Sequence, residues 1–426
     1  MKLKYYFISL LAACVLLSCS KDDGDGGETP VTPTETTLSI LVNPSTKAEV
    51  LDPQDKISDL TVLLFIGDEL YKKETKIGDN VQEIKDIPVS PGSMKALLLA
   101  NISKYSSYYS VGMSYGDAMK VTANLDNEGH GMLSMSSDVM DITITASKKN
   151  TLGYDANSIQ GYSSPIKLYR NVARVQLSEL ILDMDDNDFG RPVSFDLKKV
   201  YVANVKSKSY LASEDKTTGA VPTLDWGAVE FTTPTEKPEE FWWLGYYDDK
   251  AVTAGEFSLI MKGATKNFLC YEFTEGNNWE TLKFPYYDAG ATALGEVVLD
   301  QNTPSLKNND GNSAIGNYFY VYESKDALAS APTVLIIQGD YTYISKNTGI
   351  QETAEGVYYT IVVNDGTNTT SGVAVHKGVK RNVRYDLAIT VKGPGSPGPD
   401  PSKRAYVGAV VTVKEWTEAN LTDTVD

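Results

Sequence analysis

Short strand-like runs, separated by turn-forming residues, repeat along nearly the whole chain. Gly, Asn, Asp and Pro stand between the runs, and no apolar repeat at helical spacing persists for long. The runs cover residues 36–43, 60–67, 94–101, 141–147, 172–182, 193–205, 332–344, 356–363 and 383–392. This pattern predicts an all-β fold built from β-sandwiches, with few short helices such as one at 115–125.

The length of the chain and one turn-rich segment suggest how these strands are divided. The 426 residues are enough for two domains of ordinary size. Residues 211–227, LASEDKTTGAVPTLDWG, contain many turn formers and few core-forming side chains. We therefore expect two tandem sandwiches, at residues 48–214 and 215–426.

The amino terminus has the features of an export signal. Lys2 and Lys4 precede an apolar core that is too short for a comfortable membrane span. The core ends in Leu-Leu-Ser-Cys, which resembles a bacterial lipobox, so residues 1–18 are expected to be a lipoprotein signal peptide and Cys19 the lipidated residue. The alternative is a plain signal with an incidental cysteine. The acidic and then Pro/Thr-rich stretch that follows predicts a solvated tether.

Residues that usually carry catalysis or bind metals are scarce. The two histidines, His130 and His376, lie in loop-like settings, and no catalytic, zinc or phosphate-binding motif is present. With Cys14 in the signal and Cys19 lipidated, only Cys270 remains, so no intrachain disulfide is expected. A net charge of −17 repels phosphate backbones and argues against nucleic-acid binding. We expect no enzyme activity, no cofactor and no metal.

Two local patterns allow a second interpretation. The acidic run at 183–190 partly imitates a calcium loop, but it lacks the glycine at the sixth place and has Ser194 at the twelfth, so an acidic turn is favoured. The tryptophans in FWWLGYY, residues 241–247, are candidates for a sugar platform, although packing beside a core is favoured.

The last strand-like run, AYVGAVVTV at 405–413, is apolar on both faces. One face carries Val407, Ala409, Val411 and Val413, and the other carries Tyr406, Gly408, Val410 and Thr412. A strand on the rim of a sheet normally shows one polar face to water, so this strand is expected to be buried against a partner. The preceding GPGSPGPDP is expected to act as an extensible hinge.

The first strand-like run after the tether has an alternating apolar row that resembles that of the tail. In TTLSILVN the side chains of Leu38, Ile40 and Val42 alternate, as in a strand that fills a groove. A Val/Ala strand can occupy such a groove instead, by β-strand addition.

Several segments, in this order, resemble the Bacteroides-type fimbrillins, which are the subunits of type V pili. They are the lipobox, STKAEV (45–50), DKISDLTVLLF (55–65), LYRNVARVQL (168–177), the pair YFYVYES and PTVLIIQG within 318–339, RNVRYDLAITVKGPG (381–395) and VVTVKEW (410–416). The likeness covers nearly the whole mature chain.

This resemblance implies two transthyretin-like β-sandwiches and a structural pilus subunit that serves cell adhesion. It implies an outer-membrane lipoprotein precursor, with acyl chains such as palmitate on Cys19, that a maturation protease cuts after the first strand. Residues 19–47 are then a propeptide made of the tether and the first strand, with Lys47 and Ala48 at the cut. The released subunit joins a cell-surface fimbria.

The same resemblance assigns roles in assembly. Leu38, Ile40 and Val42 belong to the strand that is displaced. The donor strand, within a terminal hairpin at 383–416, carries Val407, Ala409, Val411 and Val413. The implied partners are other copies of the chain and accessory fimbrillins.

One departure and two alternatives stay open. Such relatives are commonly cut after arginine, yet the first arginine here is Arg170, so either the protease accepts Lys47 or the subunit stays uncut. One alternative function is an accessory fimbrillin, either an anchor or a tip. The other is a surface glycan-binding lipoprotein whose stacking platforms are chosen from Trp226, Trp242, Trp243 and Trp279.

Overall fold

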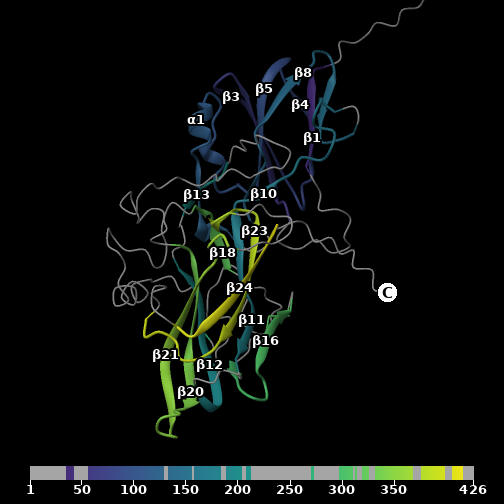
Figure 1. Ribbon diagram of the computed structural model, residues 1–426. Coiled ribbons are helices and arrows are strands. Elements are labelled where there is room, and N and C mark those ends of the chain that lie inside the picture. The colour runs from purple at the N-terminus through teal and green to yellow at the C-terminus, as the bar shows by residue number, and fades with distance from the viewer. Residues whose placement is uncertain are drawn as a thin grey trace, which may run out of the picture. The chain divides into compact units, whose positions relative to one another are not determined.

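Figure 1 shows the computed structural model, in which nearly every described element is a β-strand. The described residues are 35–42, 56–128, 133–155, 158–183, 189–203, 208–212, 270–272, 297–309, 312–313, 319–325, 332–367, 376–398 and 405–415. Residues 35–426 form one compact unit by their contacts.

Two sheets from the first part of the chain share a buried core. The smaller has the strand order β4-β1-β9, and the larger has the order β10-β7-β5-β2-β3, with β8 paired to β5. The strands of the smaller are β1 (Thr37–Leu41), β4 (Glu83–Pro88) and β9 (Lys149–Leu152). Those of the larger are β2 (Asp59–Ile66), β3 (Glu69–Ile77), β5 (Gly92–Ala100), β7 (Met135–Ser136), β8 (Met140–Ile144) and β10 (Tyr169–Arg170). Leu38 and Ile40 of β1 lie in one apolar cluster with Val62 of β2 and Leu98 of β5.

The central strands of the larger sheet, β2 and β5, are covered on both faces over most of their length. In β2 every residue except the last is buried, which is the pattern of a strand enclosed on both sides. Phe65 and Leu97 point into a second cluster, which also contains Ala118 of the helix α1 (Tyr115–Ala118). The one-turn helices η2 (Ser106–Tyr108) and η3 (Leu125–Asn127) lie in the same stretch of chain.

Two further sheets hold most of the later strands. One has the order β17-β16-β11-β23-β24, with β18 paired to β11, and the other the order β14-β12-β20-β21, with β15 paired to β12. The first contains β11 (Val172–Leu182), β16 (Ser305–Asn309), β17 (Asn312–Ser313), β18 (Phe319–Tyr322), β23 (Val383–Val391) and β24 (Val407–Glu415). The second contains β12 (Gly190–Ala203), β14 (Cys270–Glu272), β15 (Val297–Leu299), β20 (Val334–Ile344) and β21 (Gln351–Val362). Their inward side chains, such as Leu387 of β23 and Phe195 of β12, share one buried cluster.

Two short pairings complete the described strands. β13 (Lys208–Tyr210) pairs with β6 (Thr122–Asn124), and β19 (Ser324–Lys325) pairs with β22 (Gly378–Val379). The helix expected at 115–125 is only one turn long, capped by Ser114, whose hydroxyl accepts from the Asp117 amide. The predicted all-β class, with few short helices, is confirmed.

The strand pairing does not follow the division expected at residue 214. β11 and β12, both expected in the first sandwich, pair with β23 and β20 from the last third of the chain. The change of sheet occurs instead within three residues, since Arg170 ends β10 and Val172 begins β11. No loop marks this change, which is why turn composition did not indicate it.

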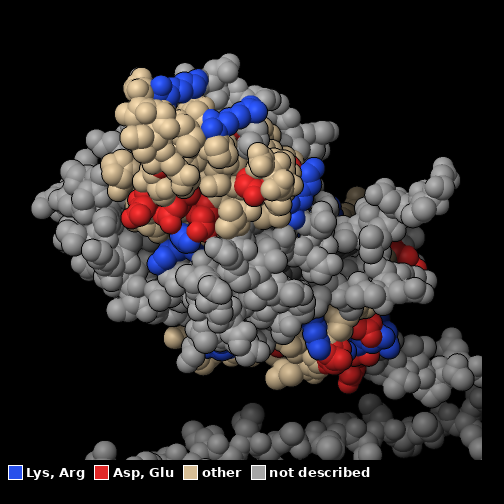
Figure 2. All heavy atoms as spheres, turned by 90° about the horizontal axis from the view of Figure 1, so that it is seen from below, with Lys and Arg blue, Asp and Glu red and all other residues tan. Residues whose placement is uncertain are grey.

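Charged side chains of opposite sign lie close together on the described surface. Figure 2 shows Lys and Arg beside Asp and Glu on the face seen from below. One such group is on the second of the later sheets, where Lys198 pairs with Asp196 and lies 4.0 Å from an Asp340 carboxylate oxygen. Among the described residues, no helix has the length and apolar composition that a membrane crossing requires.

Candidate assembly strands

Strand β1 fills a slot between two strands that lie far from it in sequence. It is antiparallel to β4, with Leu38 opposite Ile87, and parallel to β9, with Ile40 opposite Leu152. In the order of this sheet β1 alone separates β4 from β9, so both neighbours depend on it for their ladder hydrogen bonds. Removing β1 would leave two open sheet edges facing one another.

Both faces of β1 are enclosed. The side chains of Leu38, Ile40 and Val42 are 0% exposed and point into the core of the first two sheets. On the other face, Thr37 and Ser39 are only 6% and 8% exposed. The alternation read from the sequence thus corresponds to a core-facing row, and the slot is closed on its second face as well.

Polar contacts fix β1 in register at its start and at a bulge. The Ser147 amide donates to Thr36 Oγ1 at 2.8 Å, and the Asp86 amide donates to Ser39 Oγ at 3.0 Å. The second bond lies where the ladder with β4 shifts, between Leu38 and Ile40. A hydroxyl at residue 39 therefore satisfies an amide that the bulge removes from the ladder.

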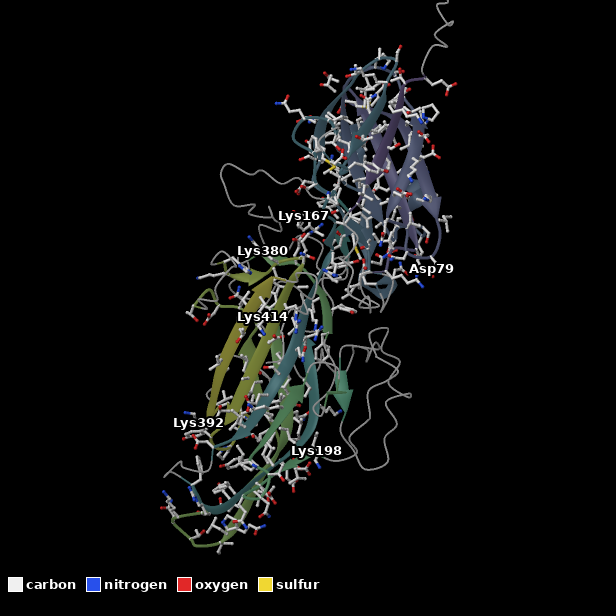
Figure 3. All side chains as sticks on the ribbon, turned by 90° about the vertical axis from the view of Figure 1, so that its right-hand side faces the viewer. Asp79, Lys167, Lys198, Lys380, Lys392 and Lys414 are labelled. Carbon is white, nitrogen blue, oxygen red and sulfur yellow. The ribbon has the colours of Figure 1, made fainter. Side chains whose placement is uncertain are left out.

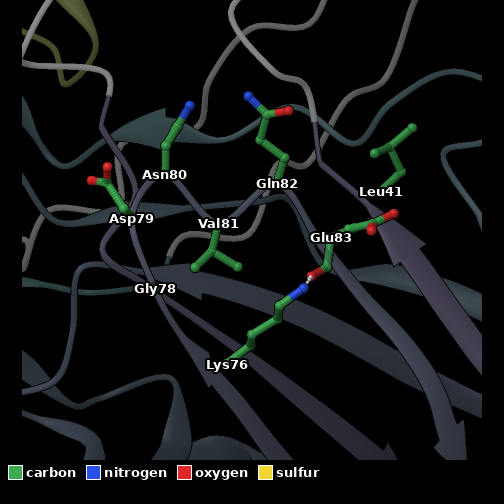
Figure 4. Close-up of a pocket in the computed structure, with 8 residues that line it drawn as sticks. All are labelled: Leu41, Lys76, Gly78, Asp79, Asn80, Val81, Gln82 and Glu83. Atoms are coloured by element: carbon green, nitrogen blue, oxygen red, sulfur yellow. Dashed lines mark hydrogen bonds between the residues drawn. The ribbon is translucent and has the colours of Figure 1, made fainter.

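The far end of the slot opens into a hollow of about 350 Å³, lined by Leu41, residue 76 and residues 78–83 (Figure 4). Lys76 Nζ donates to the Glu83 carbonyl at 2.9 Å, and Lys85 lies 2.8 Å from the Glu83 carboxylate, whose pKa it lowers by hydrogen bonding. Asp79 pairs with Lys56 at 2.5 Å. Each of these charged side chains has a hydrogen-bond or ion-pair partner, so we assign no chemical role to the hollow.

The tail strand β24 is folded back on the rest of its own chain. It is antiparallel to β23, with Val391 opposite Val407 and Arg384 opposite Lys414. Figure 3 shows Lys392 and Lys414 at opposite ends of this hairpin. At the strand's far end, Lys414 Nζ lies 3.2 Å from an Asp386 carboxylate oxygen.

One face of β24 packs against the rest of the chain more closely than the other. Val413 is 4% exposed and Val407 and Val411 are partly buried against the core, whereas Ala409 is exposed. On the other face Val410 is 68% exposed, and Tyr406, just before the strand, is 50% exposed. The second face, which makes the tail apolar on both sides, is therefore the more exposed one, above all at Val410.

Other candidate residues are placed as follows. Cys19, Lys47 and Ala48 lie outside the described residues, as do His130 and the four tryptophans proposed for sugar stacking. Of the calcium-like run, 184–188 also lie outside. His376 Nε2 is 2.8 Å from the Tyr385 hydroxyl, which the Lys380 amide also contacts. Within the described part of the chain, no group of three or more potential metal ligands occurs.

A repeated Arg-Asn-Val sequence, at 170–172 and 381–383, forms a contact that our sequence reasoning missed. The valine of each copy begins one of the parallel strands β11 and β23, and the two copies exchange hydrogen bonds. Arg170 Nη1 donates to Asn382 Oδ1 at 3.1 Å, and Arg381 Nη1 donates to Asn171 Oδ1 at 3.0 Å. The repetition of the tripeptide was the available signal.

Arg381 also anchors a buried polar network. Its Nε donates to Glu323 Oε1 at 2.9 Å, and its Nη2 reaches the Tyr210 carbonyl at 3.1 Å. Arg381 is 0% exposed and Glu323 is 1% exposed. Nearby Glu128 accepts from the Tyr322 hydroxyl at 2.9 Å, and burial raises the pKa of this carboxyl. The root of the tail hairpin is thus held by buried ion pairing.

Comparisons with known proteins agree with this architecture. Residues 36–170 match the family described as Major fimbrial subunit protein (FimA). A major fimbrium subunit FimA type-2 of Porphyromonas gingivalis is 23% identical over 444 residues, which covers 98% of each chain. A FimA type-3 subunit of the same organism is 24% identical and covers 94% of this chain and 93% of its own.

Solved structures share the fold. A cell adhesion protein from Parabacteroides distasonis superimposes with a TM-score of 0.60 at 23% identity, covering 90% of this chain and 100% of that chain. A fimbrilin from Porphyromonas gingivalis W83 gives a TM-score of 0.54 at 19% identity, covering 90% and 98%. Together with the sequence matches, they confirm the predicted resemblance to the Bacteroides-type fimbrillins.

Proposed function

We propose that this chain is a structural subunit of a cell-surface type V pilus that serves cell adhesion and polymerises by donor-strand exchange. The tail strand of one copy takes the place of β1 in the next copy. The observation that carries the proposal is the position of β1, a short strand near the amino terminus that alone separates β4 from β9. The described fimbrillin resemblance supports the same role.

Burial of apolar surface favours the tail strand in the slot over the tail strand folded back on its own chain. Folded back, the tail strand leaves Val410 68% exposed, whereas the slot encloses both faces of its strand, with Ser39 at 8% exposure. Moving the tail into the slot therefore buries valine surface that is now in water, and burying one such side chain contributes about 1.5 kcal/mol or more. Once there, withdrawal exposes the core of the acceptor, so release is slow.

Proteolytic maturation would start the strand exchange. The chain is exported as an outer-membrane lipoprotein precursor through Cys19, and a protease cuts between Lys47 and Ala48. The cut separates β1 from the rest of the subunit and removes the lipid with it. Leu38, Ile40 and Val42 are the core contacts that then leave the slot, and a loose peptide loses them far more readily than a tethered strand.

The donor strand carries Val407, Ala409, Val411 and Val413, and its partners are further copies of the chain and accessory fimbrillins. An accessory role is the second candidate, because an anchor keeps its lipid and needs no cut at Lys47. A tip subunit needs no donor strand, and the complete β23–β24 hairpin favours the shaft over the tip.

The test uses purified precursor and brief digestion with a lysine-specific protease. We expect a ladder of oligomers on mild SDS gels, because cutting after Lys47 opens the slot. Lys47→Gln controls for cuts at other lysines and should remain monomeric, and so should a chain that lacks residues 404–426. A ladder from the truncated chain, or none from the wild type, would contradict donor-strand exchange.

The mature amino terminus separates the two fimbrillin roles. Mass spectrometry of protein sheared from cells should find Ala48 as the first residue of a shaft subunit. An acylated Cys19 at that end would assign the chain to the anchor role instead.

A further inference from the structure

The segment between β23 and the tail strand was predicted to be an extensible hinge, but its described part is docked on the fold. Its described part, 392–398, lies along β21. Ser396 pairs with Tyr358 through two backbone hydrogen bonds of 2.8 and 2.9 Å, and Ser396 is 3% exposed. The chain that leads to the tail is therefore docked before the tail begins.

A buried tyrosine holds the start of this segment. The Tyr359 hydroxyl donates to the Gly393 carbonyl at 2.8 Å, and the side chain of Tyr359 is 0% exposed. Burial raises the pKa of Tyr359, so the hydroxyl stays protonated and keeps its role as donor. The carbonyl it satisfies lies in a buried residue, where an unmade hydrogen bond is costly.

Close packing leaves no room for a side chain in the docked segment. A Cβ at Gly395 would lie 2.7 Å from the Tyr358 carbonyl oxygen, which no real contact of this kind shows. A Cβ at Gly393 would lie 2.3 Å from the Phe189 ring. The glycines that suggested flexibility are those that close docking requires.

The docked segment also contacts Tyr406, at the start of the tail. The Lys392 amide donates to the Tyr406 carbonyl at 2.8 Å. The Tyr406 ring meets Phe189 edge to face at 5.1 Å between centroids, and Phe189 packs in the same way on Tyr343 at 5.2 Å. Beyond this point the tail lies at a sheet edge, with β23 as its neighbour among the described strands.

From these contacts we infer that residues 393–396, with Tyr359, Phe189 and Tyr406, form a latch that restrains the tail strand on its own subunit. The latch slows release of β24 and so keeps unassembled subunits from donating their tails too early. This role rests on the proposed function, because it regulates the strand that donor-strand exchange uses. The restraint itself is a property of the single subunit and is measurable without assembly.

The test is amide hydrogen exchange of β24 in the purified, uncut chain. Tyr359→Phe removes the hydroxyl that holds Gly393, and we expect exchange of the β24 amides to quicken about ten-fold relative to those of β20. Gly395→Ala displaces the segment from Tyr358 and should act in the same direction. Comparing the exchange rates of β24 and β20 in the same variant separates local release of β24 from a general loss of stability.

Tyr343→Phe is the matched control. It also removes one tyrosine hydroxyl, but that hydroxyl donates to Glu352 at 2.7 Å on the exposed surface, and the ring contact with Phe189 remains. We expect no change in β24. An unchanged ratio of β24 to β20 exchange in both Tyr359→Phe and Gly395→Ala would overturn the latch. A quickened ratio in a chain that forms no ladder after cutting would keep the latch and contradict the pilus role alone.

Discussion

A chain with Val410→Asp folds normally as a monomer and does not form filaments. Val410 is 68% exposed in the folded-back tail, opposite Ala388 on β23, so a carboxylate there stays in water and lowers the free energy of unfolding by less than about 1 kcal/mol. If the tail enters the slot of a neighbour, both faces of the strand become enclosed, and an unpaired carboxylate there costs several kcal/mol. We expect the yield of filaments to fall about a hundred-fold or more.

Two variants make this prediction specific. Val410→Thr keeps nearly the same size and β-propensity without the charge, so its filament yield should fall far less than that of Val410→Asp. Ile77→Asp introduces the same charge at the end of β3, where the side chain is 78% exposed, and should also assemble. Electron microscopy of cut protein and thermal melts of uncut protein give the two readouts. Wild-type filament yield from Val410→Asp would show that this face of the tail is not buried in assembly.

Arg381→Met destabilises the whole subunit. The guanidinium contacts Glu323, Asn171 and the Tyr210 carbonyl, and both it and Glu323 are essentially unexposed. Removing the cation leaves the Glu323 carboxylate buried without its ion-pair partner. Loss of one partner of a buried pair costs about 3–5 kcal/mol, and chemical denaturation should show a loss of this size.

Glu323, the ion-pair partner of Arg381, provides the control. Adding Glu323→Leu to Arg381→Met removes the stranded carboxylate, so the double variant should recover part of the lost stability. Lys392→Met removes an exposed cation from the same hairpin and should change the free energy of unfolding by no more than about 0.5 kcal/mol. A loss below about 1 kcal/mol in Arg381→Met would mean that the network does not anchor the hairpin.

Local pattern predicted the strands of this fold well because each strand carries its own signal. The row of Leu38, Ile40 and Val42 was readable from alternation, and all three side chains are buried. The same holds for β2, whose continuous apolar run matches burial on both faces. The resemblance to fimbrillins could likewise be read from the order of short segments.

Partners distant in sequence could not be read in this way. β9 lies beside β1 although more than a hundred residues separate them, and Arg381 reaches Asn171 across 210 positions. The glycines and prolines after β23 predicted an extensible hinge, because composition does not reveal that Ser396 docks on Tyr358. Side-chain pattern also showed both faces of the tail as apolar without telling which one its own sheet would cover.

The most direct test of donor-strand exchange is a disulfide between two subunits of a filament. Ile87→Cys, placed on β4 opposite Leu38, is combined in turn with a cysteine at Val407, Ala409, Val411 or Val413, in a chain with Cys270→Ser. Facing positions on paired strands lie within disulfide range.

If the tail occupies the slot, oxidised filaments carrying at least one of these pairs will run as covalent ladders that reductant collapses. Uncut precursor should give none. Well-formed filaments that stay free of intersubunit disulfides with all four pairs would contradict the placement of the tail beside β4.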